Sequence, residues 1–279
     1  MKKQMKEIPK TIHYFWFGHN PLPQEIIECI NSWKKFCPDY EIKRWDETNF
    51  KIDRAPRYVQ EAYKTKKWAF VSDYARLYIL NEYGGVYLDT DVKLIKGLDG
   101  IVEKGPFLAC EGLNPIKVNP GLGMATYSNN DLIKDILREY KNEVFILKNN
   151  QYNKKTIVTR FTERLLQDGL QDTDKVQNID GFNIYPVDYF CPLDFETGQL
   201  KITSNTVGIH LYLGSWLTDQ DKYGQALKRK MTRIFGKKIG IIISDIYIKP
   251  RNITEKIKGL GFKKAILYYV KKYFFNNRH

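Results

Sequence analysis

Hydrophobic and polar positions in the first part of the chain alternate between the period of a strand and that of a helix. Residues 11–18, TIHYFWFG, form a short aromatic and β-branched run that ends in Gly, which predicts a buried strand followed by a loop. Apolar residues recur at helical spacing over 24–36, and Pro38 ends that predicted helix. Residues 40–45 alternate like a second strand. The order strand, helix, strand predicts a βαβ unit and a parallel sheet.

A second helix and strand carry the most distinctive residues of the chain. Residues 68–83 repeat apolar side chains at helical spacing, and the two glycines at 84–85 suit the left-handed conformation that commonly ends a helix. The apolar run 86–88 follows as a short strand and delivers Asp89 and Asp91 at its carboxyl end. Because ligands of open α/β sheets bind outside these ends, we expect a site there.

The α/β pattern continues to about residue 227. Further strands are predicted over 107–110 and 207–213, a Gly-rich turn and strand over 119–126, and further helices over 132–140 and 156–166. Two amphipathic basic segments follow, at about 225–238 and 254–275. We therefore predict an α/β domain over 1–227, with a mostly parallel central sheet flanked by helices, and a basic helical extension over 228–279.

The charge of the chain is concentrated at its C-terminal end. The composition, 43% hydrophobic and 28% charged, is ordinary for a globular protein, but the net charge is +13. From Lys228 onward there are fifteen Lys and Arg and two acidic residues, which accounts for the whole excess. A nucleic-acid-binding protein that uses this basic, aromatic tail is one interpretation. The balanced body and the lack of a recognisable nucleic-acid-binding motif weigh against it.

Cysteine usage and hydropathy predict a cytoplasmic protein. Cys29, Cys37, Cys110 and Cys191 have neither metal-ligand nor redox spacing, which is typical of a reduced chain. The polar, basic start has no apolar signal-peptide core, and no stretch approaches the ~20 apolar residues of a membrane span.

The paired acidic residues suggest metal chemistry. Asp89 and Asp91 can face one cation from a turn, and their oxygen ligands suit Mg²⁺ or Mn²⁺, which commonly bridge to a substrate diphosphate. A solvated turn is the alternative, because isolated Asp-x-Asp pairs are common. Asp73 and Arg76 share a face of the preceding helix. They form either a local ion pair or a site for sugar hydroxyls and diphosphate.

Three runs of the sequence resemble one enzyme family. The run FVSDYARLYILNEYGGVYLDTDV resembles the signature of the DXD-containing glycosyltransferases. That family includes fungal initiating α-mannosyltransferases, the glycosyltransferase domains of clostridial cytotoxins, and bacterial capsule and polysaccharide enzymes. The opening IPKTIHYFWFG resembles the family's first strand, and HLYLGSW, at 210–216, resembles its late motif. The three runs follow the family's order.

The resemblance implies a GT-A-type nucleotide-sugar-binding domain and a hexosyltransferase that uses Mn²⁺ or Mg²⁺. Asp89 and Asp91 would ligate the metal, with His210 as a third ligand; a core role for His210 is the alternative. Asp73, Arg76 and Asp91 are the implied catalytic residues. The implied donor-binding residues are Phe15, Trp16, Asp73, Arg76, Tyr87, Asp89, Thr90, Asp91, Ser215 and Trp216.

The resemblance also sets expectations for substrates. Trp16 is expected to stack on the nucleotide base, with a uridine diphosphate sugar as the favoured donor. Glu111 and Asn119 are weaker candidates for an acceptor or sugar pocket. The expected acceptor is a glycan or lipid-linked glycan in surface polysaccharide synthesis, and the expected course is retention through same-face attack. A nucleotide-sugar hydrolase or a nucleotidyltransferase is the alternative enzyme, since both use paired acids and a metal.

The basic tail predicts a peripheral membrane location. Apolar residues of 254–275 can form one side of a helix with lysines flanking it. Such a helix can lie on an anionic leaflet, each Lys or Arg adding about 1 kcal/mol. This would hold the enzyme on the inner face of the cell membrane, beside a lipid-linked acceptor. The alternative is that this helix packs on the catalytic domain.

Overall fold

The computed structural model describes residues 7–214 and 219–248, which divide into two compact units. The first unit comprises Met1–Pro192 and Lys201–Leu213, and the second comprises Leu193–Leu200 and Gly214–His279. Ser215, Trp216 and the predicted helix at 254–275 lie outside the described residues.

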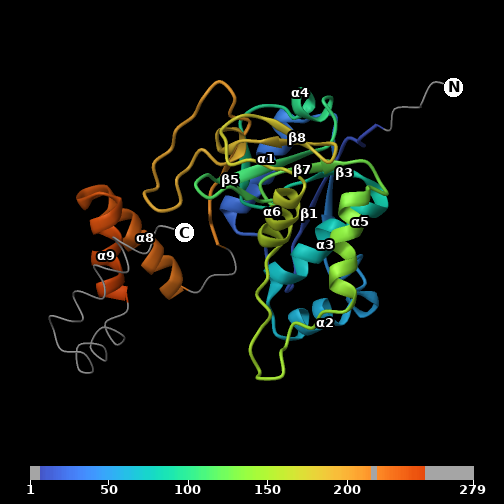
Figure 1. Cartoon of the computed structure of the whole chain (residues 1–279), viewed down its shortest axis with the longest axis horizontal. Helices are drawn as coiled ribbons and strands as arrows, with labels where there is room; N and C mark the ends of the chain where they lie inside the picture. Colours follow the sequence, from blue (N-terminus) through green and yellow to red (C-terminus); the bar gives the residue numbers. More distant parts are fainter. Residues whose placement is uncertain (1–6, 215–218, 249–279) are drawn as a thin grey trace. The chain divides into compact units, whose positions relative to one another are not determined.

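The first unit is an α/β domain in which strands and helices alternate along the chain (Figure 1). Its strands are β1 Thr11–Phe15, β2 Glu41–Trp45, β3 Gly85–Tyr87, β4 Val92–Leu94, β5 Phe107–Gly112, β6 Lys117–Val118, β7 Met124–Thr126, β8 Gln177–Ile179, β9 Phe182–Tyr185 and β10 Gly208–His210. Its helices are α1 Gln24–Phe36, the 3₁₀ helix η1 Ile52–Arg54, α2 Arg57–Lys64, α3 Trp68–Tyr83, α4 Asp99–Val102, α5 Asp131–Lys141, α6 Ile157–Gln167 and α7 Val187–Phe190.

The central sheet has the strand order β2-β1-β3-β7-β5-β9-β8, with β6 paired to β5. β1 pairs in parallel with β2 and β3, and β5 pairs in parallel with β9. β7 runs antiparallel between β3 and β5. β4 and β10 form a separate antiparallel pair. The predicted α/β class, with its opening βαβ unit and flanking helices, is confirmed.

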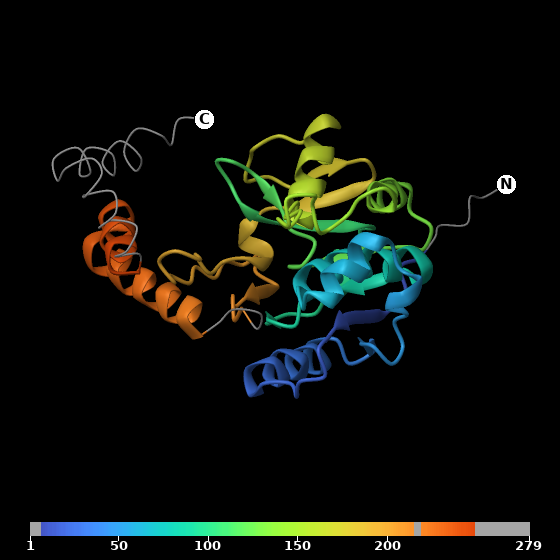
Figure 2. The ribbon, with the colours of Figure 1, turned by 90° about the horizontal axis from the view of Figure 1, so that it is seen from below.

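Side chains of β1 alternate between two hydrophobic cores on opposite faces of the sheet. Ile12 and Tyr14 belong to the core shared with α1 and α4. Phe15 belongs to the core shared with α2, α3, α5 and α6. Figure 2 shows the blue α1 on one side of the sheet and the yellow-green α6 on the other. This arrangement leaves the carboxyl ends of β1 and β3 side by side, where the predicted site begins.

Within its described residues, the second unit contains two helices, α8 Asp219–Phe235 and α9 Lys237–Ile248. Gly236, with φ 76°, separates them. A Cβ on Gly240 would lie 2.3 Å from the backbone of Thr232, so the glycine permits the two helices to approach closely. The predicted helical character of the tail is confirmed for these residues. The predicted boundary at 227/228 stays a prediction, and α8 runs through that position.

Basic residues of α8 and α9 contact the loop Leu193–Leu200 of the same unit. Arg233 Nε donates to Thr197 O at 2.8 Å, and Lys237 Nζ lies 2.7 Å from a carboxylate oxygen of Glu196. Some basic side chains of the tail therefore already have polar or acidic partners within their own unit. Among the described helices, none is both long enough and apolar enough to cross a membrane.

Candidate active site

Asp89 is held at the end of β3 by its backbone and by its side chain. Its N–H donates to Gly121 O at 2.7 Å, which ties the turn to the segment before β7. Its carboxylate oxygen Oδ1 accepts a hydrogen bond of 2.7 Å from the hydroxyl of Tyr87, which is itself buried. Burial and the neighbouring carboxylate raise the pKa of Tyr87 well above its ordinary value, so this hydroxyl keeps its proton and remains a donor.

Asp91 is held by the late strand β10. Pairing of β10 with β4 places His210 opposite Val92, one residue beyond Asp91. His210 Nε2 lies 3.2 Å from Asp91 Oδ1, and the N–H of Leu213 donates to Asp91 Oδ2 at 3.0 Å. His210 and Leu213 of the predicted late motif are thus brought to the paired acids, although the two runs are far apart in the sequence.

Charge pairing at Asp91 and His210 outweighs their burial. Burial alone would raise the pKa of Asp91, but His210 and the Leu213 N–H lower it below its ordinary value. Burial alone would lower the pKa of His210, but the Asp91 carboxylate raises it to about 10. Both groups are therefore charged at neutral pH, with a proton in the position that a cation would take.

Asp89, Asp91 and His210 fit a divalent cation. Each offers one ligand atom, and these atoms all lie within 4.8 Å of one another. Two carboxylates and an imidazole are ligand types that suit Mn²⁺, and oxygen ligands suit Mg²⁺. A metal ligand has to be deprotonated, so binding would displace the proton of His210.

Arg76 lies behind the two predicted carboxylates and contacts both. Its Nη2 is 3.1 Å from Asp73 Oδ1 and its Nη1 is 3.3 Å from Asp89 Oδ1. The guanidinium also lies over the ring of Tyr87, 4.6 Å from the ring centroid. Arg76 is 4% exposed. The local ion pair considered for Asp73 and Arg76 is present, and it extends to Asp89. A catalytic role for the two residues stays a prediction.

Asp73 is also held by the N-terminus of α6. The N–H of Ile157, the first residue of that helix, donates to Asp73 Oδ2 at 3.1 Å. Burial raises the pKa of Asp73, while Arg76 and the helix N–H favour its charged form. The sequence identified the helix, and its N-cap Thr156 signals where the helix starts. Neither feature of the sequence shows which carboxylate lies at the N-terminus of this helix.

Glu111 and Asn119, predicted for an acceptor or sugar pocket, form a layer beneath Asp89. Asn119 Nδ2 donates to Glu111 Oε2 at 2.7 Å, and Asn119 Oδ1 accepts from the Gly121 N–H at 2.8 Å. Gly121 O in turn accepts the Asp89 N–H. Contact of Glu111 and Asn119 with an acceptor stays a prediction.

Gly121 was not among the predicted site residues, although it lies in the predicted Gly-rich turn. A Cβ at this position would lie 1.9 Å from Asp89 Oδ2 and 2.8 Å from Arg76 Nη1. Only glycine leaves room for the Asp89 carboxylate here. The Gly-rich turn that begins at Asn119 was the available signal in the sequence. The sequence does not show that Gly121 faces the Asp89 carboxylate.

The aromatic residues predicted for the donor are largely buried. Phe15 is 5% exposed, in the core that contains Tyr87. Trp16 is 9% exposed, in the opposite core, and its indole N–H donates to Asn20 O at 2.7 Å. Thr90 is half-buried in the turn between the acids. Stacking of Trp16 on a base stays a prediction, as do the donor contacts of Phe15 and Thr90.

Comparison with known families identifies the segment that carries these residues. A family described as "glycosyltransferase sugar-binding region containing DXD motif" matches residues 23–108, which include Asp73, Arg76, Asp89 and Asp91. Over these residues the chain is similar to the DXD-containing glycosyltransferases. The matched region ends at residue 108, inside β5, so Gly121 and His210 lie outside it.

Three of the curated relatives carry glycosyltransferase or mannosyltransferase names. The chain is 27% identical over 201 residues to an uncharacterized glycosyltransferase, L373, of Acanthamoeba polyphaga mimivirus, covering 66% of this chain and 77% of that protein. It is 29% identical over 113 residues to inositol phosphoceramide mannosyltransferase 1 of Schizosaccharomyces pombe, covering 38% of this chain and 34% of that protein. The chain thus spans about a third of the mannosyltransferase.

One solved structure, named PaToxG glycosyltransferase, is 23% identical, with a TM-score of 0.46. The match covers 59% of this chain and 71% of that one.

Proposed function

We propose that this glycosyltransferase moves a hexosyl group from a nucleoside diphosphate sugar, with a divalent cation held by Asp89, Asp91 and His210. The convergence of these three side chains, with ligand atoms within 4.8 Å of one another, carries the proposal. His210 is the last residue of β10 and faces the Asp91 carboxylate at 3.2 Å, which favours a metal-ligand role over a role in the apolar core alone.

The bound cation would supply positive charge beside the leaving diphosphate. The chain's own residues hold that centre in place. Tyr87 and Arg76 orient the Asp89 carboxylate, while Leu213 orients Asp91. Asp73, anchored by Arg76 and α6, is the proposed acceptor of hydrogen bonds from the donor sugar. We propose same-face attack with retention, since we assign no side chain as a covalent nucleophile.

For the donor we propose a uridine diphosphate sugar, with Mn²⁺ as the cation. A mannosyl donor is a second candidate, because two relatives are named inositol phosphoceramide mannosyltransferases. Those names also favour a lipid-bearing acceptor. We propose a lipid-linked glycan of surface or capsular polysaccharide as the acceptor, and a peripheral location on the cytoplasmic face of the membrane.

A thermal-shift screen of uridine and guanosine diphosphate sugars, with and without Mn²⁺, tests the proposal. A donor that binds only the folded chain stabilises it by about 2.7 kcal/mol at a hundred times its Kd. The expected result is stabilisation that needs both Mn²⁺ and one class of donor, and that is lost in Asp91→Asn but kept in the exposed control Asp39→Asn. Equal stabilisation in the presence of chelator contradicts the metal site.

A second assay separates transfer from hydrolysis. Nucleotide release is measured with and without a glycan acceptor. A transferase releases nucleotide faster when acceptor is present, whereas release that ignores acceptor would favour a nucleotide-sugar hydrolase.

A further inference from the structure

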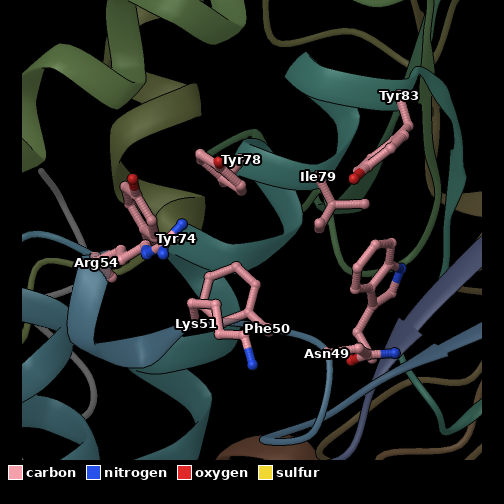
Figure 3. Close-up of a pocket in the computed structure, with 10 residues that line it drawn as sticks. Asn49, Phe50, Lys51, Arg54, Tyr74, Tyr78, Ile79 and Tyr83 are labelled. Carbon is pink, nitrogen blue, oxygen red and sulfur yellow. The ribbon is translucent and has the colours of Figure 1, made fainter.

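A groove lies beside α3, with Tyr74 and Tyr78 of that helix in its walls; Figure 3 shows the first of the two cavities that form it. It consists of two adjoining cavities of about 170 and 570 Å³, which share Tyr74 and Tyr78 in their walls. The second volume falls within the range of small-molecule sites, roughly 300–1,000 Å³. We call this feature the α3 groove. Its walls come from α3, from the segment around η1, and from α5.

Aromatic rings line one end of the α3 groove. Tyr74 and Tyr78, one helical turn apart, are stacked with centroids 6.1 Å apart, and the ring of Phe50 meets Tyr78 edge-on at 5.9 Å. Trp45 and Tyr83 form a second pair at 5.5 Å. Tyr78 is 41% exposed and Tyr83 is 53% exposed. Exposed aromatic faces beside a hollow offer apolar contact to a ligand with an apolar face of its own, such as a sugar ring.

Unpaired cations line the same groove. Lys51, Arg54 and Lys141 are exposed, and no acidic side chain pairs with them within the described part of the chain. Two further basic residues of α5 are paired: Lys134 with Asp131 and Arg138 with Asp135. The acid in the walls is Glu82. The groove therefore has an excess of positive charge that suits an anionic ligand.

We propose that the α3 groove binds an anionic carbohydrate, a glycan that carries phosphate or carboxylate groups. Its sugar rings contact Tyr78 and Tyr83, and its anionic group meets Arg54 and Lys51. Assigning this glycan as the acceptor or the product rests on the proposed function; the binding itself does not. Glu82 suits a glycan with free hydroxyls, because its carboxylate can accept hydrogen bonds from them.

Calorimetry on the intact chain, at low salt and with neither donor nor divalent cation, tests the groove. The probes are pentamannosyl phosphate, hexagalacturonate, neutral mannopentaose and inorganic phosphate. We expect both anionic glycans to bind, and to bind more tightly than mannopentaose or inorganic phosphate. Arg54→Gln should weaken binding about tenfold, the size of one charge-assisted hydrogen bond. Lys175→Gln removes one exposed charge outside the groove and should leave binding unchanged.

Two further variants separate this proposal from the metal site. Tyr78→Leu keeps an apolar side chain but removes the ring, and it should weaken both anionic glycans while inorganic phosphate is unaffected. Asp91→Asn should leave glycan binding intact, so loss of donor-dependent stabilisation in that variant says nothing against the groove.

Several results would overturn the proposal. These are no binding of either anionic glycan, equal binding of inorganic phosphate alone, or equal weakening by Arg54→Gln and Lys175→Gln. Tighter binding of a single-stranded thymidine oligomer or of phosphatidylglycerol vesicles, abolished by Arg54→Gln, would assign the groove to nucleic acid or to membrane instead.

Discussion

Replacing Gly121 with alanine should disable the paired acids without touching either of them. The new Cβ would lie 1.9 Å from Asp89 Oδ2, whereas ordinary contacts begin at 3.4 Å. The carboxylate therefore has to move by about 1.5 Å, the difference between these distances, or the backbone of the turn has to shift by a similar amount. The new Cβ would also lie 2.8 Å from Arg76 Nη1, which limits how far the side chains around it can move aside.

The displacement breaks the contacts that orient Asp89. The 2.7 Å hydrogen bond from Tyr87 and the 3.3 Å contact with Arg76 cannot both survive it. Misplacing a catalytic centre by about 1 Å costs on the order of 10²-fold in rate. Loss of one charge-assisted hydrogen bond lowers the free energy of unfolding by about 1.5–3 kcal/mol. We expect a folded protein with greatly reduced activity and weaker Mn²⁺ binding.

The assay combines Mn²⁺ titration by calorimetry, initial rates of nucleotide release, and urea unfolding. The matched control is Gly100→Ala, in the helix α4, where an added Cβ meets nothing within 4 Å. If Gly121→Ala binds Mn²⁺ and releases nucleotide as Gly100→Ala does, the placement of Asp89 against Gly121 is wrong.

Three further predictions concern pH, the donor base and the tail. Burial lowers the pKa of His13 to about 4 from an ordinary 6.5, so the folded state binds fewer protons and stability should fall as pH drops from 6.5 toward 4, by about 3 kcal/mol. Urea unfolding should show much less of this loss in His13→Gln; an equal loss in both proteins would refute it. Trp16→Ala should weaken donor binding by ~1–3 kcal/mol if its ring stacks on the base, and unchanged calorimetric affinity would make Trp16 a core residue only. Deletion after Lys249 should abolish salt-sensitive sedimentation with anionic vesicles; an intact chain that ignores those vesicles at low salt contradicts the membrane anchor.

Local periodicity was sufficient to predict the elements that carry the site. The helix predicted over 68–83 coincides with α3, because its apolar repeat is long and its end is marked by glycines. The predicted helix at 24–36 coincides with α1 for similar reasons, with Pro38 beyond its end. The helix α2, Arg57–Lys64, was not predicted, since its eight residues make only about two helical turns and a repeat that short is hard to tell from other patterns.

Contacts between distant segments could not be predicted from spacing. The approach of Ile157 to Asp73 and of Gly121 to Asp89 depends on how α6 and β7 pack on the sheet, and no local pattern encodes it. The antiparallel insertion of β7 between β3 and β5 is a tertiary outcome of the same kind. His210 could be connected to the acids only through the resemblance of its run to a family, and the structure supplies the 3.2 Å distance.

The central claim is that Asp89, Asp91 and His210 hold a cation that sugar transfer requires. The most direct measurement is Mn²⁺-dependent nucleotide release from the donor found by the screen, compared among the unaltered chain, Asp91→Asn and the control Asp39→Asn. The account predicts release in the unaltered chain and the control, no release in excess chelator, and none in Asp91→Asn, which should remain folded. Full activity in Asp91→Asn, or activity that persists in excess chelator, would contradict it.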